Sequence, residues 1–160
     1  MKTLVIYYSL EGNTHAIGQE IATALNADTI RLKPQNEPSK RFTKYLWASA
    51  TSMVKSTPKL EPITIDPQVY DLIVVGSPVW AWTYAPALKS YFNTYKISDK
   101  KVALFCCHGG AKGKYFERIK KALVGNQFVG EIDFRDPLKY DLDKAKITAS
   151  EWAKELTTTP

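Results

Sequence analysis

A short polar segment near the start of the chain carries residue types that suit anion binding. Ser9, Gly12, Asn13 and Thr14 supply a hydroxyl, a glycine, an amide and a second hydroxyl. Such a loop can surround a phosphate with backbone N–H groups and side chains, and the positive end of a following helix adds to the attraction. Because the segment contains no Lys or Arg, neutral dipoles alone would hold the anion.

The residues on either side predict the strand and the helix that would position this loop. Residues 3–8, Thr-Leu-Val-Ile-Tyr-Tyr, form a continuous apolar run, which is typical of a central parallel strand buried on both faces. Over residues 14–25, apolar side chains recur at helical spacing, among them Ile17 and Ile21. The polar loop is therefore expected at a helix N-terminus.

Strands and helices alternate along the rest of the chain. Further strands are predicted at residues 28–32, 70–78, 101–107 and 128–134. Further helices are predicted at residues 86–92, 115–123 and 144–156, with Pro86 in the first turn of the first one. This alternation predicts a single α/β domain over residues 1–160. Its doubly wound, five-stranded parallel sheet has the order 2-1-3-4-5, with helices on both faces.

The segment of residues 36–64 interrupts the alternation. Within it, residues 40–55 predict a helix that carries Phe42, Tyr45 and other apolar side chains. Two interpretations stay open. The helix covers a bound planar ligand, or it is an ordinary crossover that packs on the sheet, which suits most of its apolar residues better.

Composition narrows the class of protein. At 160 residues and 44% apolar content the chain can bury a full core. No stretch approaches the ~20 apolar residues that a membrane span needs. The adjacent Cys106 and Cys107 would point to opposite faces of a strand, which disfavours a disulfide between them. With no signal peptide recognisable at the N-terminus, a reduced, cytoplasmic protein is expected.

The formal charge of +6 is concentrated in two segments. Residues 33–59 hold six basic residues against one acidic, and residues 112–121 hold five against one. The clusters either attract an acidic or phosphate-bearing partner or are solvated helix faces, the commoner fate of surface charge. Nucleic acid is not an expected partner, because neither zinc-finger spacing nor an aromatic RNA-binding signature is present.

Two more loops are expected beside the polar one. In an open parallel sheet, ligands bind at the carboxyl ends of the strands, where the strand order reverses. The aromatic segment 77–86 and the glycine-rich segment 107–113 follow the third and fourth predicted strands and would meet the polar loop there. A ligand with a phosphate and a flat, partly apolar ring would match all three. Residues 109–114 lack the spacing of a nucleotide-binding P-loop.

Several residues of these loops carry alternatives. His108 tunes the electronics of a bound ring, or it is a polar surface group, as loop histidines more often are. Cys107 is an exposed redox thiol or, more commonly, a small buried residue at a strand end. Trp82 and Tyr84 flank a ring or pack beneath their loop.

The first two loops resemble those of the flavodoxin family. Residues 9–14, Ser-Leu-Glu-Gly-Asn-Thr, are similar to its phosphate-binding loop, and residues 76–80, Gly-Ser-Pro-Val-Trp, are similar to its first flavin-ring loop. The 107–113 loop lies where the second ring-contacting loop belongs. By element order the resemblance spans the whole chain. It implies a flavodoxin-like fold that binds flavin mononucleotide (FMN) noncovalently and transfers electrons.

Carried over to this chain, the resemblance implies three groups of cofactor-binding residues and no catalytic side chain or metal ligand. The phosphate would be held by Ser9, Glu11 (through its backbone N–H), Gly12, Asn13 and Thr14; the isoalloxazine ring would lie along Pro78, Val79, Trp80 and Ala81; and its pyrimidine side would meet His108, Gly109 and Gly110.

Three hypotheses of function follow. The first is an FMN-binding electron-transfer protein that works with a redox partner protein. The second is an FMN-dependent NAD(P)H:quinone-type oxidoreductase with small-molecule donors and acceptors. The third is a module that has lost the flavin, against which the intact residues 9–14 argue. Electron-carrier flavodoxins are typically acidic and this chain is basic, which suits an acidic partner or a nicotinamide phosphate. A monomer and a homodimer are both compatible with the sequence.

Overall fold

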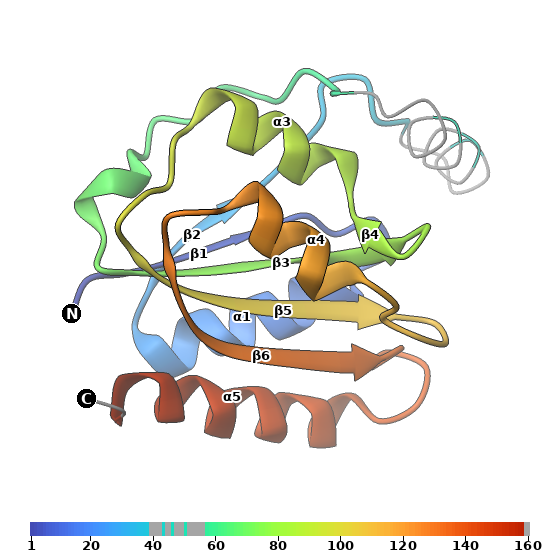
Figure 1. The fold of residues 1–160 in the computed structure, drawn as a ribbon. Coiled ribbons are helices and arrows are strands. Elements are labelled where there is room, and N and C mark those ends of the chain that lie inside the picture. Colours follow the sequence, from blue (N-terminus) through green and yellow to red (C-terminus); the bar gives the residue numbers. More distant parts are fainter. Residues whose placement is uncertain (39–42, 44–45, 47–49, 51–56, 159–160) are drawn as a thin grey trace.

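The computed structural model describes residues 1–38, 43, 46, 50 and 57–158 and shows a central sheet between two layers of helices (Figure 1). The parallel strands are β1 (Thr3–Tyr7), β2 (Asp28–Arg31), β3 (Leu72–Trp80), β5 (Lys101–His108) and β6 (Gln127–Arg135). Their order is β2-β1-β3-β5-β6, and the two-residue β4 (Thr83–Tyr84) pairs antiparallel with β3. Counted without this short strand, the predicted order 2-1-3-4-5 is confirmed.

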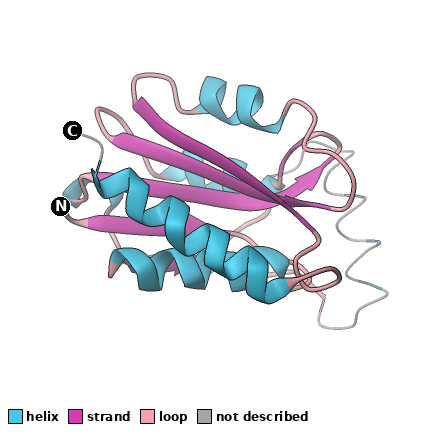
Figure 2. Ribbon diagram, turned by 90° about the horizontal axis from the view of Figure 1, so that it is seen from below, coloured by secondary structure: helices cyan, strands magenta, loops and turns pink. Residues whose placement is uncertain are grey.

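The helices cover both faces of the sheet (Figure 2). On one face α1 (Asn13–Leu25) and α5 (Leu142–Thr158) lie against each other, and on the other lie α3 (Pro86–Thr94) and α4 (Tyr115–Ala122). Pro86 occupies the first turn of α3, as predicted, where the missing N–H costs no helical hydrogen bond. None of the helices formed by the described residues is long and apolar enough to cross a membrane.

Alternation of side chains along β1 builds the two hydrophobic cores. Leu4 and Ile6 point toward the α3 and α4 layer, whereas Val5 and Tyr7 point toward α1 and α5. All four are buried, and each fully buried aliphatic side chain contributes about 1.5–3 kcal/mol relative to an exposed one. Parallel pairing with β2 on one side and with β3 on the other, where Val5 lies opposite Val74, makes β1 an interior strand of the sheet.

Backbone hydrogen bonds join the start and the end of the excursion of residues 36–64. The backbone N–H of Gln35 donates to the carbonyl oxygen of Lys59 at 2.9 Å, and that of Glu61 donates to Lys33 at 2.8 Å. The two ends of the excursion therefore pair with each other before the chain continues to β3. Most of the helix predicted at residues 40–55 lies outside the described residues.

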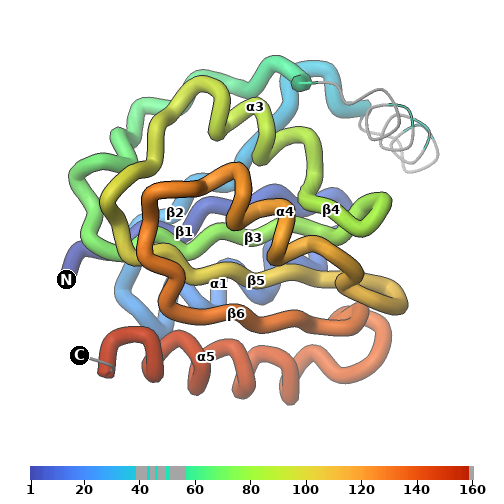
Figure 3. Tube along the Cα trace, viewed as in Figure 1, coloured from blue at the N-terminus to red at the C-terminus, as the bar shows by residue number. Residues whose placement is uncertain are grey.

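The chain leaves the sheet at the same edge after β1, β3, β5 and β6 (Figure 3). This carboxyl edge is where the strand order reverses, between β1 and β3. All three predicted loops lie at this edge, and the segment that joins β6 to α5 lies there with them.

Candidate functional site

The segment between β1 and α1 leaves a helix N-terminus uncapped at the carboxyl edge. Gly12, the residue that precedes α1, has φ of 108°, which favours glycine, and its N–H donates to Oγ of Ser9 at 3.1 Å. Because the capping residue Gly12 has no side chain, no side-chain hydrogen bond caps the helix, and the first turn of α1 contains no acidic residue. The N–H groups of this turn and the positive end of the helix dipole can therefore bind an anion. Glu11 is exposed beside it.

The first two side chains of α1 tie the polar loop to other parts of the edge. Oδ1 of Asn13 accepts a hydrogen bond from the backbone N–H of Leu138 at 2.9 Å, in the β6–α5 segment. Thr14 is only 1% exposed, and its side chain is hydrogen-bonded to Cys107 at the end of β5. These contacts hold the start of the helix in place. Sequence reasoning missed Leu138, because a contact across 125 positions leaves no local signal.

The residues expected along a flat ligand lie on a β-hairpin. The segment 77–86 follows the third parallel strand, as predicted, but β3 continues to Trp80 and pairs with β4, so the prediction that the strand ends at Pro78 is wrong. Pro78, Val79 and Trp80 are the last residues of β3, and a turn at Ala81 leads into β4. The indole of Trp80 meets the ring of Tyr8 edge to face, with centroids 5.5 Å apart. The hairpin therefore presents an aromatic side chain directly beside the end of β1.

The hairpin turn is held in a conformation that its residues rarely adopt. Ala81 and Trp82 have φ of 48° and 59°, and a left-handed residue with a Cβ costs about 1–2 kcal/mol. Trp82 packs on Gly113, where an added Cβ would lie within 2.8 Å of the indole side chain. The side chain of Trp82 nevertheless remains 66% exposed, whereas Tyr84 packs against Phe92 beneath the hairpin.

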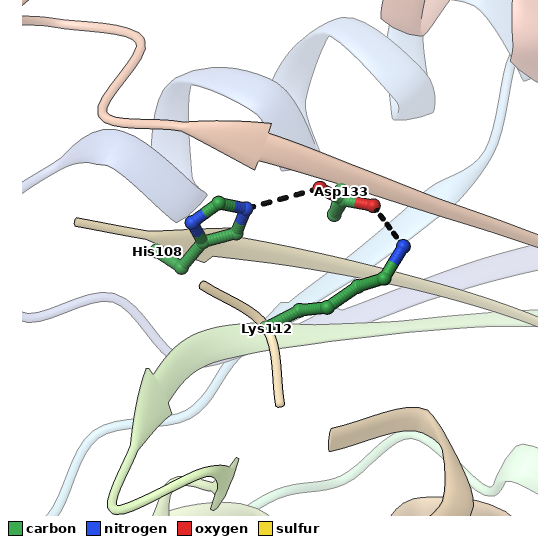
Figure 4. Close-up of polar contacts among 3 residues, drawn as sticks. All are labelled: His108, Lys112 and Asp133. Atoms are coloured by element: carbon green, nitrogen blue, oxygen red, sulfur yellow. Dashed lines mark hydrogen bonds and ion pairs between the residues drawn. The ribbon is translucent and has the colours of Figure 1, made fainter. Parts of the chain in front are cut away.

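At the end of β5, three polar side chains form a chain of hydrogen bonds (Figure 4). Nε2 of His108 lies 3.0 Å from Oδ2 of Asp133 in β6, and Nζ of Lys112 donates to Oδ1 of the same carboxylate at 2.6 Å. Burial raises the pKa of Asp133, but the hydrogen bonds from Lys112 and His108 outweigh it, so that the pKa lies below its usual value. The side chain of His108 is 8% exposed, so it is not a surface group.

The two glycines that follow His108 are exposed, and the cysteines that precede it are not. Burial raises the pKa of Cys107 to about 12 and raises that of Cys106 as well. The structure therefore supports the buried strand-end interpretation of Cys107. Asp133, like Leu138, was not predicted, because a single acidic residue in an alternating strand is typical of a solvent-facing position.

Part of the basic charge of residues 112–121 is neutralised by β6. Lys112 pairs with Asp133, and Lys120 pairs with Glu131. Lys114, Arg118 and Lys121 remain exposed. Two of the five basic residues are thus neutralised, and the three exposed ones are compatible with both interpretations of the cluster. The other basic cluster lies largely outside the described residues.

Comparison with known proteins agrees with this geometry. The family model described as Flavodoxin matches residues 2–136. A flavoprotein from Lactobacillus acidophilus, solved in complex with FMN, is 25% identical, with a TM-score of 0.70 over 89% of this chain and 97% of that one. Oxidised flavodoxin 2 from Bacillus cereus is 20% identical, with a TM-score of 0.61 over 98% of each chain. Comparison with curated proteins finds no match.

The family match spans most of the chain. It contains all three predicted parts of the carboxyl edge: the uncapped start of α1, the aromatic hairpin and the His108 cluster. The chain therefore belongs to the flavodoxin family.

Proposed function

We propose that this protein binds FMN at the carboxyl edge of its sheet and transfers electrons. The observation that carries the proposal is the uncapped N-terminus of α1, which offers backbone donors but no acidic side chain to a phosphate. The family match and the FMN complex of the Lactobacillus acidophilus relative support the same cofactor.

Each group of residues at the edge fits one part of FMN. Residues 9–14 would bind the phosphate through N–H groups and hydroxyls, with the Glu11 carboxylate turned to solvent. The end of β3 and the turn, Pro78 to Ala81, would contact the isoalloxazine ring, and Trp80 offers the aromatic surface. His108, Gly109 and Gly110 would border its pyrimidine side. FMN would supply the redox chemistry, while these residues bind and orient it and set the polarity around it.

We favour electron transfer to and from a partner protein, which the match to the flavodoxin family supports. The fully buried thiols, both unpaired, fit a reducing compartment, so we place the protein in the cytoplasm. Small-molecule turnover as an oxidoreductase is the competing outcome of the test below.

An absorption spectrum tests the cofactor first. Purified protein is incubated with FMN, desalted and scanned in the visible range. Flavin bands that survive desalting support the proposal, and a colourless protein that leaves FMN fluorescence unquenched contradicts it.

The loaded protein is then mixed with NADPH, with and without a quinone, and separately with a reduced iron–sulfur protein. An electron carrier accepts electrons from the iron–sulfur protein and oxidises NADPH poorly. Rapid quinone-dependent oxidation of NADPH would identify an oxidoreductase instead.

A further inference from the structure

Asp133 determines which nitrogen of His108 carries the proton. With its pKa held below the usual value, the Asp133 carboxylate is ionised at neutral pH and can only accept hydrogen bonds. Lys112, whose pKa its hydrogen bond to Asp133 raises, keeps the other carboxylate oxygen occupied. Nε2 of His108 therefore carries the proton that it shares with Asp133, and in this tautomer the lone pair lies on Nδ1.

Nδ1 of His108 has no hydrogen-bond partner among the described residues, although it is buried. Figure 4 shows this nitrogen on the side of the ring away from Asp133. A buried acceptor without a partner costs about 1–3 kcal/mol, so such atoms in native proteins call for an explanation. A donor supplied by a ligand at this edge would remove the cost.

The neighbouring loop can admit the edge of a ring. Gly109 and Gly110 are exposed, and no atom lies within 4 Å of the place where a Cβ of Gly110 would stand. The pyrimidine ring of oxidised isoalloxazine presents acceptors at N1 and at its two carbonyl oxygens, and a single donor, N3–H. In the tautomer with its proton on Nε2, Nδ1 is an acceptor and matches only that donor.

On the basis of the proposed FMN function, we infer that Nδ1 of His108 accepts a hydrogen bond from N3–H of the flavin, and that Asp133 and Lys112 are positioning residues that hold the imidazole in the tautomer able to do so. No proton is transferred in this contact. The cluster would thus favour the imide edge of a flavin over a ring that is alkylated at N3.

Binding of FMN and of its N3-methyl analogue tests the inference. Dissociation constants are measured by fluorescence quenching for the wild-type protein, for His108→Leu and for Asp133→Asn. The wild-type protein is expected to prefer FMN about tenfold, the size of one hydrogen bond whose acceptor is otherwise unpaired. His108→Leu should lose most of this preference. Equal preference in both proteins would overturn the inference.

Nitrogen-15 NMR of the histidines gives a second readout, and its titration of the wild-type protein with FMN depends on neither a variant nor the methylated analogue. The chain has two histidines, and His15 serves as an internal reference. In the wild-type protein, the signal of the unprotonated His108 Nδ1 should shift toward the hydrogen-bonded range on addition of FMN, and much less with the analogue. In Asp133→Asn the two tautomers should mix. A protonated Nδ1, or one that FMN leaves unchanged, would overturn the inference.

The two proposals fail in different ways. If FMN does not bind, the proposed function falls and this inference falls with it. If FMN binds but neither the binding preference nor the His108 signal behaves as expected, only the role of His108 is wrong.

Discussion

The hydroxyl oxygen of Ser77 accepts a hydrogen bond from the backbone N–H of Ala85 at 3.2 Å, which joins the two ends of the β3–β4 hairpin. Ser77 is fully buried, and its hydroxyl also lies 2.9 Å from the carbonyl oxygen of Pro78. One side chain therefore closes the segment that carries the expected ring-binding residues.

Ser77→Ala should destabilise the protein and weaken FMN binding together. The substitution leaves the buried N–H of Ala85 without a partner, which costs about 1–3 kcal/mol in the free energy of unfolding. Urea unfolding measures the stability, and fluorescence titration measures the affinity. Ser90→Ala is the matched control: Ser90 is also buried, but its hydroxyl donates to the carbonyl oxygen of Pro86 in its own helix. Equal losses of stability and of FMN affinity in the two variants would show that the hydrogen bond between Ser77 and Ala85 contributes no more than the helical contact of Ser90.

Much of this architecture could be predicted from local patterns. The apolar runs that became β1, β3 and β5 are buried on both faces, and such runs identify central parallel strands without further information. The uncapped start of α1 could also be predicted, because a glycine after a strand and before a helical pattern marks that junction.

The hairpin and the His108 cluster could not be predicted in the same way. Two-residue hairpin turns are normally signalled by Gly or Asn, whereas this turn consists of Ala81 and Trp82 and is stabilised by packing on Gly113. The pairing of His108 with Asp133 depends on the register between β5 and β6, which brings together residues 25 positions apart. Contacts between residues far apart in the sequence determine both the hairpin turn and the His108 cluster, and local sequence patterns do not reveal such contacts.

Asn13→Asp should separate phosphate recognition from ring recognition. The new carboxylate can still accept the hydrogen bond from Leu138, so the fold should be preserved. Its negative charge at the start of α1 would repel a phosphate there, and two unit charges about 4 Å apart interact by about 4 kcal/mol near a protein surface. FMN affinity should fall at least tenfold, while affinity for riboflavin, which has no phosphate, should stay within about twofold. A similar loss for both ligands would contradict a phosphate site at this helix.

The two cysteines should be unreactive in the folded protein. Burial raises the pKa of Cys107 to about 12 and raises that of Cys106, so almost no thiolate is present at neutral pH. A colorimetric disulfide reagent at pH 8 should label the native protein at least about 100-fold more slowly than protein unfolded in guanidinium chloride. Rapid labelling of one thiol in the native protein would show that the end of β5 opens readily, and would revive a redox role for Cys107.

Protonation of His15 should weaken the fold as the pH falls. Nδ1 of His15 lies 2.8 Å from the hydroxyl of Tyr7, which accepts a hydrogen bond from Gln19 and has its own proton to donate to an unprotonated Nδ1. Burial, and secondarily the charge of Arg31, lower the pKa of His15 below its ordinary value of 6.5. Near pH 6.5 the unfolded chain consequently binds a proton that the folded chain does not bind. The free energy of unfolding therefore decreases as the pH is lowered below 6.5.

The variant His15→Asn isolates this effect, because the amide oxygen can still accept from Tyr7 but does not titrate near neutral pH. Urea unfolding at pH 7.5 and pH 5.5 should show a larger loss of stability on acidification for the wild-type protein than for the variant. His108 is present in both proteins, so its contribution cancels from the comparison. Parallel pH dependences would mean that the folded protein accommodates the protonated imidazole by breaking the Tyr7 contact without cost.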